Sequence, residues 1–279
     1  MEKKMIVREF DPEEIPVVES FFFGDMTGTV MFLDIENSLR ISASLLPRGT
    51  YEFLKKVLLP VIKCVEDHYG FIVQIQGDGV IAVFGHDKQS CSRHAELAVN
   101  CAIEAQKLIR GLDPIEIKGR EFPLAARIGI CSGNMFATMM EYFGKYEYNI
   151  MGLTVNLASR LQKKCANYKT NILVDNATNA YIHEEILTRK IGAVTINGNP
   201  GLMTIYEVMA RYGEHTKEDL RRKRHYEEGL DYYKRKAWPE ALRSFLQVGE
   251  DKASYEMIKR CKKRLSALSR NTGPLNKNK

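Results

Sequence analysis

Residues 71–84 read FIVQIQGDGVIAVF, two apolar stretches that flank Gly77-Asp78-Gly79. Two β-prone stretches joined by so short an Asp-Gly turn are a strong β-hairpin signal. We therefore expect strands at 71–76 and 80–84, with Asp78 at the tip of the turn.

The segments on either side extend this hairpin into a recognisable order of elements. Residues 29–35 are apolar except at Thr29 and Asp34 and predict a buried strand, as do residues 124–130. Residues 47–69 and 90–109 carry apolar side chains at helical spacing, and each stretch ends close to a glycine. The resulting order β-α-β-β-α-β predicts an α+β, ferredoxin-like fold, with an antiparallel sheet covered by helices on one face.

Further elements follow this core and complete a first domain. We expect a strand pair near 134–138 and 146–150, a helix over 155–165, a strand at 171–174 and a closing hairpin near 193–196 and 203–208. The predicted division is an N-terminal lead over residues 1–24 and a folded domain over residues 25–210.

A short, charged helical tail is predicted after this domain. Within residues 218–268, Gly229, Tyr232, Ala241 and Phe245 stand at the spacing of a tetratricopeptide repeat. A lone repeat cannot bury its apolar face, so it should pack on the first domain or mediate dimer contacts. Residues 269–279 hold almost nothing to bury, and we expect them to be disordered.

Composition and charge exclude several classes of protein. With 279 residues and 44% hydrophobic content the chain can bury a core, and no apolar run reaches the length of a membrane-spanning helix. The N-terminus interleaves charges with apolar residues, unlike a secretory signal, so we expect a cytoplasmic protein. The net charge of +6 gathers in the tail, where residues 211–279 hold 19 Lys and Arg against 10 Asp and Glu. No nucleic-acid motif accompanies this charge, which favours a solvated helical face.

The six cysteines suggest no chemistry by their spacing. Cys64, Cys91, Cys101, Cys131, Cys165 and Cys261 form no C-x-x-C pair. We expect free thiols, with Cys91 and Cys101 in the same helix.

Two carboxylates give the first sign of chemistry. Asp34 ends a buried strand and Asp78 tips the neighbouring hairpin, so on this topology both can reach the same end of adjacent central strands. Either residue alone is explained as a turn or cap residue. The pair offers the hard oxygen ligands that suit Mg²⁺ or Mn²⁺.

Three stretches then resemble the signature motifs of class III adenylate and guanylate cyclases. They are FLDI at 32–35, GDGVIAVFG at 77–85 and GLTVNLASRL at 152–161. Their order and intervals also fit that family, and the resemblance covers roughly residues 28–208. It implies the class III nucleotide cyclase fold and a phosphorus-oxygen lyase activity that makes a 3′,5′-cyclic nucleotide and pyrophosphate.

The resemblance also assigns roles to particular residues. Asp34 and Asp78, with the backbone carbonyl of Ile35, would hold two Mg²⁺ or Mn²⁺ ions per site for in-line attack by the ribose 3′-hydroxyl. Asn156 would orient the ribose, and Arg160 would stabilise charge on the reacting phosphate. Because each site in this family is shared between two catalytic domains, a homodimer is implied.

The base-reading positions depart from the usual pattern. Adenylate cyclases usually carry Lys, and guanylate cyclases Glu, where this chain has Gln74. The second position, commonly Asp or Thr for adenine and Cys for guanine, is Asn149. A carboxamide both donates and accepts, so either purine fits.

Other departures affect the expected rate and dimer affinity. Asn197 stands where a basic residue often contacts the terminal phosphates, and residues 36–39 replace a Gly-Phe-Thr run that lines the triphosphate. Thr138 and Glu141 occupy positions where glycines are common in the arm that helps dimers form.

The leading hypothesis from sequence is an adenylate cyclase that converts ATP to cyclic AMP as a homodimer. A guanylate or dual-specificity cyclase is the alternative within enzymes. A catalytically weak, cyclase-like regulatory or docking module, which engages a protein partner through the tail, is the alternative of another class. No P-loop or Rossmann fingerprint is present to support a different nucleotide enzyme.

Overall fold

The computed structural model describes residues 22–117, 119–142, 145–196 and 199–271. These residues fall in two compact units. The first holds the chain up to Cys165 together with Asn171–Ile182, and the second holds Ala166–Thr170 and the chain from His183 onward.

The first unit is an α+β structure. Its strands are β1 (Gly24–Ile35), β2 (Gly70–Gln76), β3 (Gly79–Phe84), β4 (Ile115–Ile117), β5 (Arg120–Phe122), β6 (Ala126–Tyr142), β7 (Lys145–Met151) and β8 (Ile172–Asp175). Its helices are α1 (Ser38–Ser42), α2 (Pro47–Asp67), α3 (His94–Arg110), most of α4 (Leu153–Tyr168) and α5 (Asn176–Ile182).

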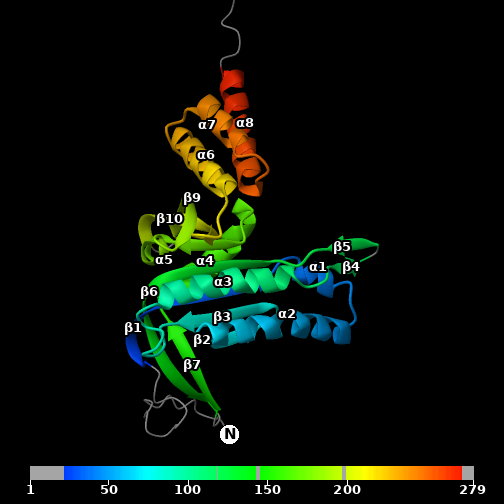
Figure 1. Ribbon diagram of the computed structural model, residues 1–279, viewed down its shortest axis with the longest axis vertical. Helices are drawn as coiled ribbons and strands as arrows, with labels where there is room; N and C mark the ends of the chain where they lie inside the picture. Colours follow the sequence, from blue (N-terminus) through cyan, green and yellow to red (C-terminus); the bar gives the residue numbers. More distant parts are fainter. Residues whose placement is uncertain (1–21, 118, 143–144, 197–198, 272–279) are drawn as a thin grey trace, which may run out of the picture. The chain divides into compact units, whose positions relative to one another are not determined.

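The main sheet of this unit confirms the predicted ferredoxin-like core. Its strands lie in the order β2-β3-β1-β6-β8, with β7 paired to β6 (Figure 1). The first four of these strands pair antiparallel, and β8 runs parallel to β6. The core order β1-α2-β2-β3-α3-β6 is the βαββαβ arrangement expected from the sequence.

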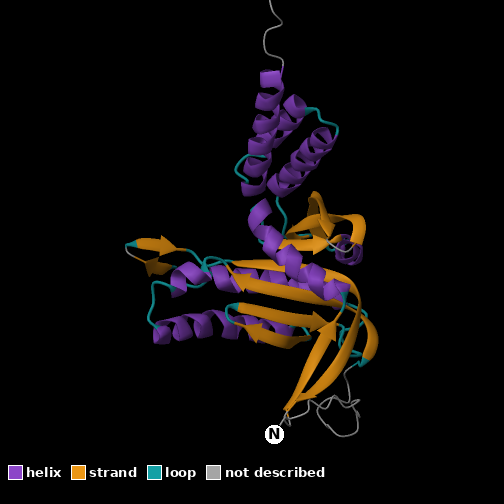
Figure 2. Cartoon of the chain, turned by 180° about the vertical axis from the view of Figure 1, so that it is seen from behind, coloured by secondary structure: helices purple, strands orange, loops and turns teal. Residues whose placement is uncertain are grey.

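Helices lie on both faces of this sheet. Figure 2 shows the strands in front of α2 and α3, so these two helices share one face. On that face Thr29 of β1 hydrogen-bonds His94 of α3 and Ser132 of β6, at 2.7 Å each. Side chains alternate along a strand, so Phe32 and Asp34 of β1 lie on the opposite face.

A glycine lets α4 pack closely against that opposite face. Gly129 of β6 pairs with Phe32 of β1. A Cβ at Gly129 would lie 2.2 Å from the backbone nitrogen of Gln162 and 2.3 Å from the carbonyl oxygen of Ala158. The backbone of α4 therefore rests directly on β6, beside Asp34.

Several elements differ in extent from the sequence prediction. The expected strands at 124–130 and 134–138 are one strand, β6, because β1 pairs with its first two thirds and β7 with the remainder. Helix α3 begins at His94 instead of residue 90. Ser90 instead stabilises a turn, where it accepts a hydrogen bond from the Gly85 amide and donates one to Asp87. Cys91 lies in this turn and is exposed, so its predicted place in the helix with Cys101 is wrong.

The second unit joins a β-hairpin to three helices. Strands β9 (Ile186–Ile196) and β10 (Asn199–Arg211) pair antiparallel, which confirms the predicted closing hairpin in longer form. Helices α6 (Lys217–Lys234), α7 (Trp238–Gln247) and α8 (Lys252–Asn271) follow, with α7 in contact with both others. Gly229 of α6 allows the close approach of Phe245 of α7, because a Cβ there would lie 2.9 Å from the ring.

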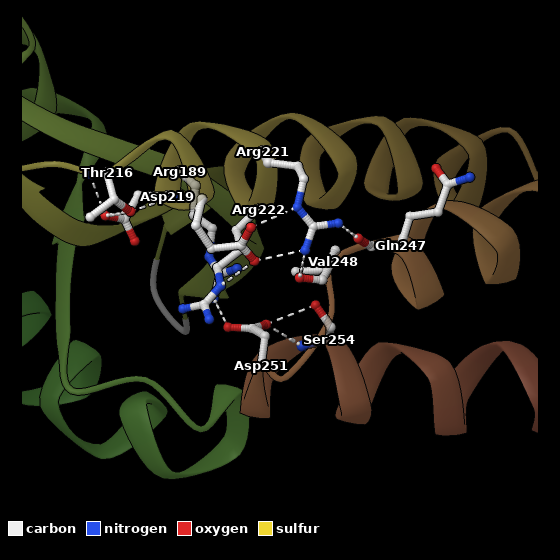
Figure 3. Close-up of polar contacts among 10 residues, drawn as sticks. Arg189, Thr216, Asp219, Arg221, Arg222, Gln247, Val248, Asp251 and Ser254 are labelled. Atoms are coloured by element: carbon white, nitrogen blue, oxygen red, sulfur yellow. Dashed lines mark hydrogen bonds and ion pairs between the residues drawn. The ribbon is translucent and has the colours of Figure 1, made fainter.

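Buried charges connect the hairpin to the helices within this unit. Arg189 of β9, 2% exposed, donates hydrogen bonds to Glu207 of β10 and to Asp251, which precedes α8. Asp251 also accepts the backbone amide of Ser254 at 2.7 Å (Figure 3). Thr216 and Asp219 form a capping box that begins α6.

Two predicted segments fall largely outside the described residues. The lead over residues 1–24 is described only from Phe22, and β1 begins at Gly24. The predicted disordered segment 269–279 overlaps α8 as far as Asn271, and its remainder is not described. Among the described helices, none is both long and apolar enough to span a membrane.

Candidate active site

The hairpin turn brings Asp78 to the end of β1. Asp34 of β1 pairs directly with Gly79 of β3, and Gln76 pairs with Gly79 across the turn. Gly77 has a φ of 62°, and a positive φ at the first central residue of a two-residue loop is the pattern of a type II′ turn. Asp78 therefore stands one residue away from the cross-strand partner of Asp34, as predicted.

The Asp78 carboxylate disfavours the charged form of Asp34. Burial and the neighbouring Asp78 raise the pKa of Asp34 to about 6, against smaller opposing effects of Arg127 and of a hydrogen bond from Gln162. The Gln162 amide donates to Asp34 Oδ2 at 3.2 Å. The positive charge of Arg127 does not offset the repulsion between the two carboxylates. Their oxygens are hard ligands, and a divalent cation such as Mg²⁺ or Mn²⁺ would supply the missing positive charge.

A cavity of about 190 Å³ opens beside Asp34. Strand β1, the end of β2, the start of β3 and α4 supply its walls. The lining residues are Phe32, Leu33, Asp34, Gln76, Gly79, Val80, Ile81, Ser159, Gln162 and Lys163. The cavity therefore combines a carboxylate, two carboxamides and a lysine, a polar set suited to a charged ligand.

Ile35 follows Asp34 in β1 but does not line the cavity. Its side chain is fully buried and its residue pairs with Ala126 of β6. Any role of Ile35 in binding is thus confined to its peptide groups.

Asn156 and Arg160, predicted to act on the ribose and the phosphate, do not line the Asp34 cavity. They stand one turn apart on α4 and are both exposed. The lining residues Ser159, Gln162 and Lys163 come from the neighbouring face of the same helix. Helix α4 thus has two polar faces: one lines the cavity at Asp34, and the other, with Asn156 and Arg160, is exposed.

The predicted base-reading residues also lie apart from this cavity. Gln74 is exposed on β2, and Asn149 is half-buried on β7, where its amide donates to the carbonyl of Glu147 at 3.3 Å. Neither residue lines the cavity. Asn149 pairs with Thr138 of β6, one of the positions at which the sequence departs from the pattern. Asn197, another such position, lies outside the described residues.

Sequence reasoning missed the α4 residues that face Asp34. Gln162 and Lys163 come directly after the third motif and belong to no motif of their own. Their helical spacing from Ser159 was the available signal, because residues three and four apart share a face. Gly129 was a second signal, since a glycine inside a strand marks a close backbone approach.

Comparisons with known proteins identify a family. Residues 26–210 match the model of the family described as "Adenylate and Guanylate cyclase catalytic domain". The chain is 28% identical over 264 residues to "Adenylate cyclase, terminal-differentiation specific" of Dictyostelium discoideum, covering 90% of this chain and 12% of that protein. It is also 28% identical over 197 residues to "Adenylate cyclase 1" of Rhizobium meliloti, covering 69% and 30%.

Solved structures give the same result. The adenylyl cyclase CyaB from P. aeruginosa is 27% identical, with a TM-score of 0.57 over 66% of this chain and 94% of that one. The guanylate cyclase domain of RhGC from Catenaria anguillulae, solved in complex with GTP, is 26% identical, with a TM-score of 0.57 over 67% and 98%. The chain spans less than a third of the length of either curated relative named above.

Proposed function

The chain belongs to the adenylate and guanylate cyclase catalytic domain family, and we propose that it converts a purine nucleoside triphosphate to the 3′,5′-cyclic monophosphate and pyrophosphate. In this reaction the ribose 3′-oxygen bonds to the α-phosphorus, the bond to the pyrophosphate oxygen breaks, and the 3′-hydroxyl proton is released. The observation that carries the proposal is the opposed pair Asp34 and Asp78 beside a polar cavity.

Asp34 and Asp78, with the carbonyl of Ile35, would hold the divalent ions on which this class of cyclase generally depends. Bound Mg²⁺ or Mn²⁺ supplies positive charge to the triphosphate and lowers the pKa of the attacking hydroxyl. Gln162 orients the Asp34 carboxylate through its hydrogen bond. Lys163, in the cavity wall, offers a further positive charge to an anionic ligand.

The active unit is proposed to be a homodimer with shared sites. Asn156 and Arg160 are exposed and lie away from the Asp34 cavity of their own chain. A partner chain can therefore receive them at its own cavity. Exposed apolar side chains gather on β6, β7 and the start of α4, where Phe136, Met140, Met151 and Leu153 are between 44 and 50% exposed. Such a face is suited to pairing with a second copy.

ATP is the preferred substrate in this proposal. The curated relatives named above are adenylate cyclases, whereas one of the similar solved structures holds GTP. Gln74 and Asn149 each carry a donor and an acceptor, which supports a guanylate or dual-specificity cyclase as the alternative.

The test is cyclic-nucleotide formation by the purified full chain, with ATP or GTP and with Mg²⁺ or Mn²⁺. An Asp78→Ala variant serves as the control. Product from ATP that disappears in the control supports the proposal, and product mainly from GTP reverses the substrate preference alone. Absence of product from both nucleotides, at concentrations where dimers are demonstrated, contradicts the enzymatic proposal.

A regulatory or docking module is the second candidate. The observations that favour it are the substitutions at Gln74, Asn149 and Asn197 and the three-helix tail, for which we propose a tetratricopeptide-like partner-binding role. Residues 1–210 make up about 75% of the chain. The Dictyostelium discoideum relative aligns with 90% of the chain, so its alignment must also include part of this tail. The assay above distinguishes the two candidates, because a docking module yields no product.

A further inference from the structure

A cluster of three metal-ligating side chains lies between α2 and α3, on the face of the sheet away from Asp34. Cys64 belongs to α2, His68 ends that helix, and Cys101 belongs to α3. One ligand atom from each residue lies within 4.8 Å of the other two. Cys64 and Cys101 are 4% and 0% exposed, and His68 is half-buried, which leaves one side of the cluster open to small ions.

The separations within the cluster fit a tetrahedral metal. Bonds of about 2.3 Å to sulfur and about 2.0 Å to nitrogen at tetrahedral angles place two sulfurs about 3.8 Å apart and sulfur and nitrogen about 3.5 Å apart. The Cys64 and Cys101 sulfurs are 3.9 Å apart, and the Cys64 sulfur is 3.8 Å from His68 Nδ1. A disulfide would require a separation of about 2.05 Å, so the two sulfurs are not bonded to each other.

The chemistry of the cluster favours a soft cation. Two sulfurs and an imidazole suit Zn²⁺ and similar ions, whereas Mg²⁺ and Mn²⁺ prefer the carboxylates at Asp34 and Asp78. His68 Nδ1 lies 2.8 Å from the carbonyl oxygen of Cys64, and ligation through Nδ1 would replace this hydrogen bond.

We propose that Cys64, His68 and Cys101 form a binding site for a thiophilic divalent cation of the Zn²⁺ type, separate from the Asp34 and Asp78 site. Among the described residues no fourth His, Cys, Asp or Glu side chain belongs to the cluster, so a water would complete the tetrahedron. The bound ion links α2 to α3 and stabilises the helical layer that covers the sheet.

The test uses Co²⁺ as a spectroscopic probe on the reduced, metal-free full chain, with excess Mg²⁺ present to occupy the carboxylate site. We expect one equivalent of Co²⁺ per chain, with a thiolate-to-cobalt charge-transfer band and the visible bands of tetrahedral cobalt. Added Zn²⁺ should remove these bands. The melting temperature should rise on binding.

Matched variants assign the bands to the cluster. Cys64→Ser and Cys101→Ser should each weaken binding by about tenfold or more, and His68→Gln should weaken it while keeping the charge-transfer band. Cys165→Ser replaces a buried cysteine of α4 outside the cluster and should bind as the wild type does. Circular dichroism checks the fold of each variant, and His68→Gln, at the half-buried position, provides the test if a cysteine variant does not fold.

Three results would overturn the proposal. The first is the absence of a charge-transfer band from wild-type protein with one equivalent of Co²⁺. The second is an unchanged charge-transfer band in folded Cys64→Ser or Cys101→Ser, or an unchanged Co²⁺ affinity in folded His68→Gln. The third is conversion of Cys64 and Cys101 to a disulfide by a mild thiol oxidant in protein that binds no Co²⁺, which would make the cluster a redox pair.

Discussion

Asp34 occupies a position that disfavours its charge. Burial and the Asp78 carboxylate raise its pKa to about 6. We expect Asp34→Asn to raise the free energy of unfolding of metal-free protein, by no more than about 1 kcal/mol because Asp34 is half-buried. The same change should lower cyclase activity by about 100-fold or more. Asp113→Asn, whose side chain is 92% exposed, should change neither quantity. A metal-free Asp34→Asn protein less stable than the wild type would contradict this explanation.

The pH dependence of this effect has a definite sign. Between the ordinary Asp pKa of 3.8 and about 6, the folded protein holds the Asp34 proton and the unfolded chain releases it. Stability contributed by this group therefore falls as pH rises through that window. In chemical denaturation without metal, the advantage of Asp34→Asn over wild type should shrink as pH is lowered from 7 towards 5. A constant difference across this range would show that Asp34 does not titrate there.

Gln162 provides a test of how the carboxylate is oriented. Its amide donates to Asp34 Oδ2, and Gln162→Leu removes that donor while roughly keeping the volume. We expect an apparent affinity for Mg²⁺ about tenfold weaker, from the Mg²⁺ dependence of the rate. Ser159→Ala, in the same cavity wall, is the matched control and should retain wild-type affinity.

At the scale of elements, the packing of α4 on β6 depends on Gly129. Gly129→Ala places a methyl group 2.2 Å from the α4 backbone, so the helix or the strand must shift. We expect a loss of about 3 kcal/mol in the free energy of unfolding, measured by denaturant titration. Gly111→Ala is the control. Gly111 ends α3 with a φ of −77°, and an added Cβ would come no closer than 3.4 Å to its neighbours.

The elements of the core could be predicted from local sequence, whereas the short ones could not. The Asp-Gly turn between two apolar stretches identified β2 and β3, and helical spacing identified α2, which is long enough to repeat its pattern. Helix α1 and the β4–β5 hairpin have only five and three residues per element, too few for a period to appear. The full length of β6 depends on its partners β1 and β7, which no local window contains.

The part of the candidate site that depends on the hairpin turn at Asp78 was predictable from the sequence. The approach of Asp34 and Asp78 followed from the hairpin and the strand order. The contribution of Gln162 did not, because it depends on how closely α4 packs on Gly129. The Cys64, His68 and Cys101 cluster was missed because its ligands come from two helices separated along the chain.

At the scale of the folded units, a buried arginine connects the hairpin and the tail helices. Arg189→Met would leave Glu207 and Asp251 without their shared cation. Removing one partner of a buried ion pair costs about 3–5 kcal/mol, so we expect a loss of that size in the stability of the second unit. Arg243→Met, on an exposed pair with Glu240, should cost less than about 0.5 kcal/mol. Equal losses for the two variants would contradict the structural role of Arg189.

For the whole molecule, the proposed active site is built from two chains, and variants of each chain can test this. In the proposed shared site, Asp78→Asn removes a carboxylate from the metal-binding half, and Arg160→Ala removes the guanidinium proposed to come from the other chain. Each homodimer should therefore be inactive. A mixed dimer of the two variants has one site with both defects and one intact site.

The most direct measurement is cyclic-nucleotide formation by this mixed dimer, isolated through a different affinity tag on each chain. We predict about half of the wild-type rate per dimer, since one of the two sites is complete. If the mixed dimer is no more active than the two inactive homodimers while the wild type turns over, the site lies within a single chain and the shared-site mechanism is wrong.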